Sequence, residues 1–253
     1  MLRLKFFLTL IGTAAIGGFG LSTLSSAQSA QATKSSGPIL VELFTSQGCS
    51  SCPPADRLAQ RLAREEGLVV ISRPVDYWDR LGWKDTLARP SNTALQRAYA
   101  RRGLGGYNGV YTPQMVVSGT IGDVGSNERA LRASIRTSKG FPRAAAMSVQ
   151  RVDSQGFAVG IAGAAERPAE LWLLGVSSEE TIAIKRGENR GRTVRYTNAL
   201  MDERRLETWN GGTHSLAIKD AELRMEGADR YALVLKEPNG GRVLAAQWLT
   251  KAL

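Results

Sequence analysis

The first part of the chain alternates strand-forming runs with apolar positions at helical spacing. Residues 39–45 are rich in strand formers, interrupted only by Glu42, and predict a buried strand. Residues 68–72 predict a second strand of the same kind. Between them, a helix that ends at Gly67 is predicted by apolar side chains at intervals of three and four residues, namely Ala55, Leu58, Ala59, Leu62 and Ala63. The pattern therefore predicts a strand–helix–strand unit.

The alternation continues to about residue 140. A helix is predicted from Ser91 to about Arg101, a strand over 114–118, a short strand or turn over 121–125, and a helix over 128–137. This order of strands and helices within about 100 residues is typical of an α/β domain. We therefore predict the α/β class and assign residues 38–141 to one domain.

The pattern changes after Phe141 and Pro142. Short β-like runs now follow one another, separated by Gly, Asn and Pro turns, and no helical period is seen. Such spacing favours an antiparallel sandwich, so we predict a smaller all-β, sandwich-like domain over 142–253. The predicted strands are 146–152, 157–162, 169–176, 180–185, 193–196, 214–218, 230–236 and 243–249.

The N-terminus has the order of a secretory signal peptide. A short basic start is followed by an apolar stretch and then by the cleavage pattern Ala30-Gln31-Ala32. We predict that residues 1–32 are removed and that the mature protein is periplasmic or secreted, without stable membrane insertion. An uncleaved N-terminal anchor is the alternative, although the densest apolar part, residues 6–16, is shorter than the roughly 20 residues of a spanning helix.

Charge adds little to this picture. The net charge is +10, but the arginines are scattered and no Lys/Arg block with interleaved aromatics is found. We interpret the excess as a solvated basic surface and expect no nucleic-acid partner. The sequence does not indicate an oligomeric state.

The two cysteines are the strongest chemical signal. Cys49 and Cys52 enclose a very small loop, which makes a weak structural staple, and export would place them in an oxidising compartment. If Ser51 is the N-cap, Pro53 and Pro54 fill early helix positions and Cys49 lies just before the helix. Positive potential and free N–H groups there favour a thiolate. We predict Cys49 as nucleophile and Cys52 as resolving cysteine.

Metal binding and an inert disulfide are the alternative uses of the cysteine pair. Zinc usually takes four ligands, and the chain offers two cysteines and one distant histidine, His214. A copper site would have Met115 as its only further ligand candidate. A permanently closed, inert disulfide is the main alternative. We expect no metal and no cofactor.

Several further residues are candidates for the same site. Pro113 precedes an apolar strand, where a cis bond would leave the Thr112 backbone free to bind an extended partner; an ordinary trans proline is the alternative. Glu42 is either a buried proton shuttle for a thiol or a solvated edge residue. Trp78 and Trp83 are core anchors or walls of the Cys49 groove.

One glycine-bounded segment remains after these assignments. Residues 187–192 read as a tight polar hairpin. The alternative is an anion site formed by Arg190 and Arg192.

These motifs together resemble the thioredoxin-like superfamily and, more closely, a secreted bacterial family catalogued as domain of unknown function 1223. The resemblance covers five segments spread through the mature chain, residues 41–56, 75–85, 96–100, 110–117 and 187–193. The superfamily implies a thioredoxin-like fold and dithiol–disulfide exchange by Cys49 and Cys52, with Pro113 as a cis proline. The chain departs from the pattern in three places: at Gln47-Gly48, where thioredoxins usually have an aromatic residue; at Glu42, which is one residue further from the first cysteine than the thioredoxin acid; and at Pro74, where the family typically has a histidine.

We therefore expect an exported thiol–disulfide oxidoreductase that acts on protein or small-molecule thiols and disulfides. The alternative is a non-catalytic thioredoxin-like binding module in which the disulfide only shapes a groove.

Overall fold

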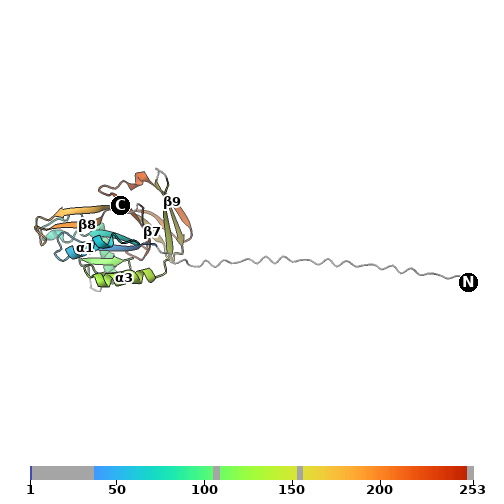
Figure 1. Ribbon diagram of the computed structural model, residues 1–253, viewed down its shortest axis with the longest axis horizontal. Helices are drawn as coiled ribbons and strands as arrows, with labels where there is room; N and C mark the ends of the chain where they lie inside the picture. Colours follow the sequence, from blue (N-terminus) through green and yellow to red (C-terminus); the bar gives the residue numbers. More distant parts are fainter. Residues whose placement is uncertain (2–36, 105–108, 153–155, 250–253) are drawn as a thin grey trace. The chain divides into compact units, whose positions relative to one another are not determined.

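The chain up to Gly140 follows the predicted order of elements (Figure 1). The computed structural model describes residue 1 and residues 37–104, 109–152 and 156–249, so the predicted signal peptide lies outside the described residues apart from residue 1. The elements of this part are β1 (Ile39–Thr45), α1 (Pro53–Leu62), β2 (Leu68–Pro74), η1 (Asp79–Leu81), α2 (Pro90–Arg101), β3 (Gln114–Val117), β4 (Ile121–Val124) and α3 (Glu128–Gly140).

Strands dominate the rest of the described chain. They are β5 (Ala145–Val152), β6 (Gly156–Gly163), β7 (Ala169–Ala183), β8 (Thr193–Trp209), β9 (His214–Lys219), β10 (Arg230–Lys236) and β11 (Val243–Trp248), with a short helix η2 (Asp220–Leu223). Two differ from the sequence prediction. The runs 169–176 and 180–185 form most of the single strand β7, and β8 is far longer than the predicted 193–196. Its charged segment 202–205 hides the strand pattern, but its backbone still pairs with β7.

The strands form two sheets. The larger has the order β11-β10-β7-β8-β2-β1-β3-β4, and the smaller has the order β5-β6-β9. In the larger sheet β1 is parallel to β2 and antiparallel to β3, whereas β8 meets β2 through one parallel pair, Ser72 with Ala199. Strands from before and after Pro142 therefore share one sheet, and Lys34–Leu253 is a single compact unit. The protein is a mixed α/β protein with a large sheet and few helices.

Both faces of β1 are covered. On one face Val41 and Leu43 pack with α1 and α3, which lie on the same side of the sheet (Figure 1). On the other face Leu40 packs with residues of β2, β7 and β10, and Phe44 packs with Tyr99 of α2. Because strand side chains alternate between faces, the two sets follow the parity of the residue number. This parity decides which β1 residues face the helix that follows the cysteines.

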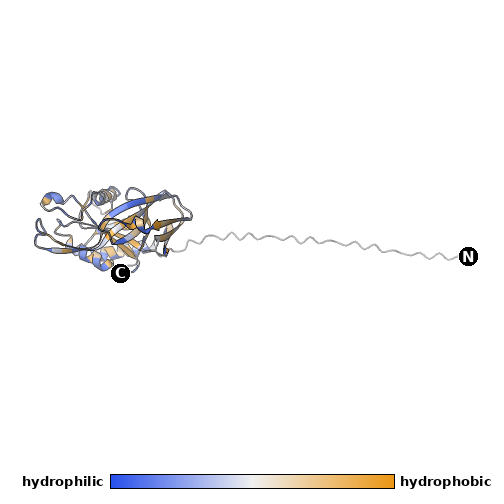
Figure 2. Ribbon diagram, turned by 90° about the horizontal axis from the view of Figure 1, so that it is seen from above, coloured by the Kyte–Doolittle hydropathy of each residue, from blue (hydrophilic) through white to orange (hydrophobic). Residues whose placement is uncertain are grey.

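The two sheets pack against each other through apolar side chains. Phe157, Val159 and Ile161 of β6 pack against Leu171 and Leu233 of the larger sheet. Figure 2 shows the hydrophobic colouring gathered in the strands, as expected when sheets bury their faces against helices and against each other. The part after Pro142 is thus a two-layer packing of strands.

Candidate active site

The two cysteines lie in the turn between β1 and α1. They are joined by a disulfide, with their Cα atoms 5.4 Å apart. Neither cysteine has exposed surface (0%), while Ser50 and Ser51 between them are exposed. The Cys49 N–H donates to the Ser46 carbonyl at 3.1 Å, which closes the turn. The sulfurs are therefore sheltered at the end of the sheet rather than presented at the surface.

The start of α1 differs by one residue from the prediction. Cys52, not Ser51, is the N-cap, and Pro53 and Pro54 occupy the first helical positions. Since proline has no N–H, those positions offer no amide donor. The next two amides, of Ala55 and Asp56, donate to the Cys52 carbonyl at 2.8 and 3.1 Å. The helix thus offers Cys49 its dipole but few free donors.

The Ser51 hydroxyl lies close to the Cys49 sulfur, at the helix start where free amide donors are few. The Ser51 Oγ is 3.4 Å from the Cys49 Sγ. In the reduced protein this hydroxyl is placed to donate to a Cys49 thiolate, because a thiolate is an acceptor only. Ser51 is therefore a site residue that the sequence reading used only as a presumed cap.

Asp56 is a buried carboxyl one helical turn after Cys52. Its Oδ1 accepts the Thr45 hydroxyl at 2.8 Å, and its Oδ2 is buried without a hydrogen-bond partner among the residues that the structure describes. Burial raises the pKa of Asp56 to about 8, against the lowering effect of the Thr45 hydrogen bond, and the nearby charge of Asp85 raises it further. With this pKa, the Asp56 carboxyl, one helical turn from Cys52, keeps its proton at neutral pH.

Asp85 fixes the turn that precedes the cysteines. Its Oδ2 accepts the Gln47 N–H at 2.8 Å and its Oδ1 accepts the Leu87 N–H at 2.9 Å. Burial raises the pKa of Asp85 to about 6, although these backbone hydrogen bonds act in the opposite direction. The Gln47 side chain accepts from the Trp83 indole N–H at 2.8 Å. Trp83 therefore contacts the cysteine turn, and it also packs against the apolar cluster that contains Leu87 and Ile184.

Trp78 connects the cysteine turn with the Thr112–Pro113 segment. Its indole N–H donates to the Thr112 Oγ1 at 2.9 Å. A Cβ at Gly48 would lie only 3.2 Å from the Trp78 Cβ, so the close approach of this wall favours glycine. The Thr112–Pro113 peptide bond is cis. The structure thus brings the predicted Thr112–Pro113 segment to the cysteine turn, with Trp78 between them.

The β7–β8 hairpin supplies the other side of the site. Asn189, 1% exposed, donates from its amide nitrogen to the carbonyls of Gln47 and Cys49, at 3.0 and 2.8 Å. The Ser50 N–H donates to a carboxylate oxygen of Glu188 at 3.3 Å. The segment is a hairpin, as predicted, and its role in holding the cysteine turn went unpredicted because 140 residues separate Asn189 from Cys49.

Glu42 is buried but points to the other face of the sheet. Its carboxylate accepts from the Arg73 guanidinium at 2.6 Å and from the Tyr99 hydroxyl at 2.6 Å. Arg73, itself 1% exposed, also donates to Glu203 and Asn92. Burial alone would lower the pKa of Arg73, but the Glu203 and Glu42 carboxylates outweigh it and raise the pKa. Glu42 is therefore part of a buried ion cluster on the α2 side, whereas α1 and the cysteines lie on the opposite side.

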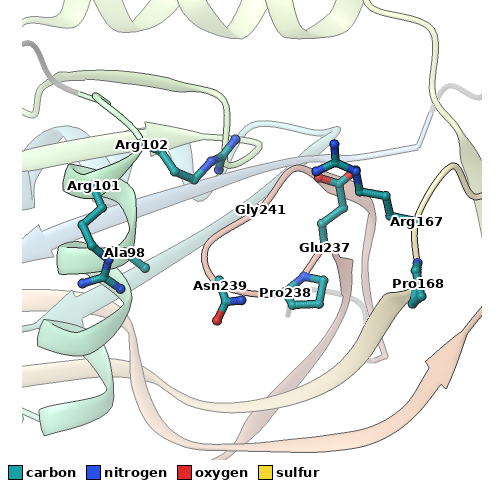
Figure 3. Close-up of a pocket in the computed structure, with 9 residues that line it drawn as sticks. All are labelled: Ala98, Arg101, Arg102, Arg167, Pro168, Glu237, Pro238, Asn239 and Gly241. Carbon is teal, nitrogen blue, oxygen red and sulfur yellow. The ribbon is translucent and has the colours of Figure 1, made fainter.

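A separate hollow of about 700 Å³ lies between the end of α2 and the β10–β11 turn (Figure 3). In Figure 3 the side chains of Arg101, Arg102 and Arg167 point in different directions. The Arg102 guanidinium donates to the Gly119 and Gly240 carbonyls. The positive charges do not converge, so we assign no ligand to this hollow.

The described residues offer neither a metal-binding cluster nor a membrane-spanning helix. No group of three or more His, Cys, Asp or Glu side chains in that part of the chain is arranged to hold a metal ion. Within the same residues, no helix combines the length and the apolar character needed to cross a membrane.

Comparison with known proteins gives a family and a fold. A model of the family described as "Protein of unknown function (DUF1223)" matches residues 40–236, which is more than half of the chain. A probable thioredoxin of Archaeoglobus fulgidus is 40% identical over 38 residues, which are 15% of this chain and 42% of that protein. The match therefore spans less than half the length of this curated relative.

Solved structures extend the similarity to most of the chain. The crystal structure of an Agrobacterium tumefaciens protein has a TM-score of 0.71 at 26% identity and covers 85% of this chain and 96% of its own. HBP35 of Porphyromonas gingivalis has a TM-score of 0.54 at 13% identity, over 84% of this chain and 74% of its own. At that identity the second likeness concerns the fold alone.

Proposed function

The chain belongs to the DUF1223 family of proteins of unknown function, and we propose that it is a thiol–disulfide oxidoreductase that uses the Cys49–Cys52 pair. The observation that carries this proposal is the disulfide at the start of α1 with the protonated Asp56 carboxyl one turn behind it. A tiny disulfide loop stabilises a fold little, whereas a disulfide beside a proton donor is suited to exchange. The short match to a thioredoxin supports the same reading.

We also propose a thioredoxin-like fold for residues 38–141 and a sandwich-like arrangement for 142–253. The central strand β1, with α1 and α3 on one face and α2 on the other, supports the first. The packing of β5, β6 and β9 on the larger sheet supports the second. In this proposal the second part is not an independent module, because its β7–β8 hairpin holds the cysteine turn.

In the proposed reaction, a partner dithiol is oxidised in two exchange steps. A partner thiolate attacks the Cys49 Sγ, the Cys49–Cys52 bond breaks, and Cys52 leaves with the electron pair. A second partner thiolate then attacks the partner sulfur of the mixed disulfide and releases Cys49. Two electrons pass from the partner to the protein, and the partner gains a disulfide. A partner disulfide is reduced by the same steps in reverse.

Asp56 moves the proton in this scheme. It donates its proton to the leaving Cys52 thiolate and regains one from the second partner thiol. The first partner thiol loses its proton to solvent and the released Cys49 thiolate takes one up from solvent, so two protons in all accompany the two electrons. Its position supports the role, since its N–H donates to the Cys52 carbonyl and its Oδ2 has no partner among the described residues. Glu42 has no part in this scheme because Arg73 and Tyr99 hold its carboxylate on the other face.

The Thr112–Pro113 segment is the proposed binding site for the partner. We propose that the cis Thr112–Pro113 segment leaves the Thr112 backbone for an extended partner chain, while its hydroxyl is held by Trp78. The proposed compartment is the periplasm or the exterior, on the strength of the N-terminal sequence, and the proposed partners are protein or small-molecule thiols and disulfides.

A second function has one observation in its favour. Both cysteines are fully buried, as expected for a disulfide that only shapes a binding module. On that reading the pair never cycles. The two functions differ in whether Cys49 forms a covalent bond with a partner.

Trapping a mixed disulfide at Cys49 distinguishes the two proposed functions. In a reduced Cys52→Ser variant, Cys49 is expected to attack glutathione disulfide and to keep the glutathione, because no resolving thiol remains. Intact-protein mass spectrometry should show one stable adduct, while the reduced parent protein should return to its internal disulfide. The matched Cys49→Ser variant should form the adduct much more slowly. If the native Cys52→Ser protein forms no adduct although its thiol is alkylated after unfolding, exchange at Cys49 is excluded.

A further inference from the structure

The end of the β7–β8 hairpin is fixed directly to the cysteine turn. We call residues 185–192 the tip. Asn189 of the tip donates to the Gln47 and Cys49 carbonyls, and Glu188 accepts the Ser50 N–H. At its near end, a Cβ on Gly187 would lie 3.3 Å from the Trp83 Cβ. A partner that reaches Cys49 therefore lies against the tip.

The tip is strongly basic at its surface. It carries four exposed cationic side chains, Lys185, Arg186, Arg190 and Arg192, and one exposed carboxylate, Glu188. That carboxylate is turned onto the Ser50 N–H. Arg192 donates to the Asn189 side-chain oxygen at 3.0 Å, which leaves the amide nitrogen of Asn189 aimed at the cysteine turn.

The other three cations, Lys185, Arg186 and Arg190, form no ion pair within the described part of the chain. Among the residues that the structure describes, no carboxylate pairs with Lys185, Arg186 or Arg190, although other exposed arginines such as Arg61, Arg151 and Arg205 do pair. All three lie within four residues of Asn189, which contacts the Cys49 carbonyl. At physiological salt, charges act over roughly 8 Å, so a partner segment that lies against the tip is within reach of these cations.

We propose that the tip is the docking surface for the exchange partner and that it selects a cysteine-containing segment rich in Asp and Glu. This inference rests on the proposed function and names its substrate class. Acidic side chains beside the reacting cysteine would meet Lys185, Arg186 and Arg190. The tip that holds the Cys49 turn would thus also select the partner.

The test compares two peptides on the reduced mature protein. One peptide carries an internal disulfide flanked by glutamates, and the other has the same sequence with lysines in those places. A neutral small disulfide, hydroxyethyl disulfide, reports the intrinsic reactivity of Cys49. We expect the acidic peptide to react about tenfold or more faster than the basic one at low salt, and the difference to shrink as salt rises.

Charge reversal locates the effect. The double variant Arg186→Glu/Arg190→Glu should lose about tenfold in rate toward the acidic peptide, after division by its rate with hydroxyethyl disulfide. The matched variant Arg136→Glu/Arg224→Glu changes the net charge equally at exposed positions of α3 and of the segment after η2. It should keep the preference. The division removes any change in thiol reactivity caused by the new charges.

The outcomes distinguish the inference from its premise. Reaction with all three disulfides but without preference for the acidic peptide overturns the docking surface and leaves the oxidoreductase standing. Equal losses in the tip variant and the matched variant also overturn it, because the effect would then be one of net charge. No reaction with any disulfide refutes the proposed function itself.

Discussion

Replacing Cys49 with alanine is expected to abolish disulfide exchange. The proposed reaction forms a covalent bond to the Cys49 sulfur, and removing a covalent nucleophile typically costs three orders of magnitude or more. Turnover of a disulfide peptide, followed with a regenerating dithiol, should fall to the rate seen without protein. The matched Ser50→Ala variant, which changes an exposed side chain between the cysteines, should keep full turnover.

The fold should survive this change. Closing so small a loop contributes about 2 kcal/mol or less to stability, and the cysteine turn is also held by Asn189 and Asp85. Circular dichroism and the thermal midpoint check this point. Unchanged turnover in a folded Cys49→Ala protein would contradict the proposed mechanism.

Replacing Asp56 with asparagine is expected to slow exchange and to stabilise the protein at alkaline pH. Loss of a general acid or base commonly costs about a hundredfold in rate. Asparagine keeps an oxygen for the Thr45 hydroxyl but cannot transfer the proton. The pre-steady-state rate of Cys52 release with a dithiol measures the first effect. The exposed carboxyl of Asp202 supplies the control, Asp202→Asn, which should leave this rate unchanged.

The stability effect follows from the raised pKa. The carboxyl of the unfolded chain ionises near pH 4, while the folded protein keeps the Asp56 proton up to about pH 8. The effect of Asp56 on the free energy of unfolding therefore depends on pH. The free energy of unfolding is highest below pH 4, falls as pH rises from 4 to 8, and is constant above that range. Asparagine has no proton to lose, so the variant should gain on the order of a few kcal/mol relative to the parent between pH 4 and pH 8.

Denaturant unfolding at pH 4, 6 and 8 measures this gain. If the difference between variant and parent does not grow with pH, Asp56 is ionised in the folded state. It could not then donate a proton to Cys52. A slower rate together with higher stability is the combination expected of a functional carboxyl buried at a cost.

Most elements were predictable because their patterns are local. The strand at 39–45 appears as predicted, whereas the helix begins one residue later than its predicted cap implied and ends at Leu62 rather than near Gly67. Strand β8 was predicted only over 193–196, and its continuation went unpredicted because residues 202–205 are all charged. Its backbone pairs with β7 regardless of which side chains face solvent. A hydrophobic pattern reports burial, and a strand that leaves the covered part of a sheet no longer needs it.

The site was predictable only where it is local. The cysteine pair and the Thr112–Pro113 segment follow from short motifs. Glu42 was a candidate proton shuttle because it interrupts an apolar strand, yet strand alternation places it with Leu40 and Phe44 on the α2 side. Counting four residues from Cys52 along the helix leads to Asp56.

Long-range partners had no sequence signal. Asn189 and Glu203 lie 140 and 130 residues from the groups that they hold.

The reduction potential of the Cys49–Cys52 pair decides between a cycling and a structural disulfide. The mature protein would be equilibrated in glutathione or dithiothreitol buffers of known potential, and its thiols counted by alkylation and mass spectrometry. The Ser50→Ala variant, treated in the same way, is the control for the alkylation procedure. We predict a single two-electron transition well above about −300 mV. A potential below that value, with the pair still closed in the most reducing glutathione buffers, would contradict an exchange function.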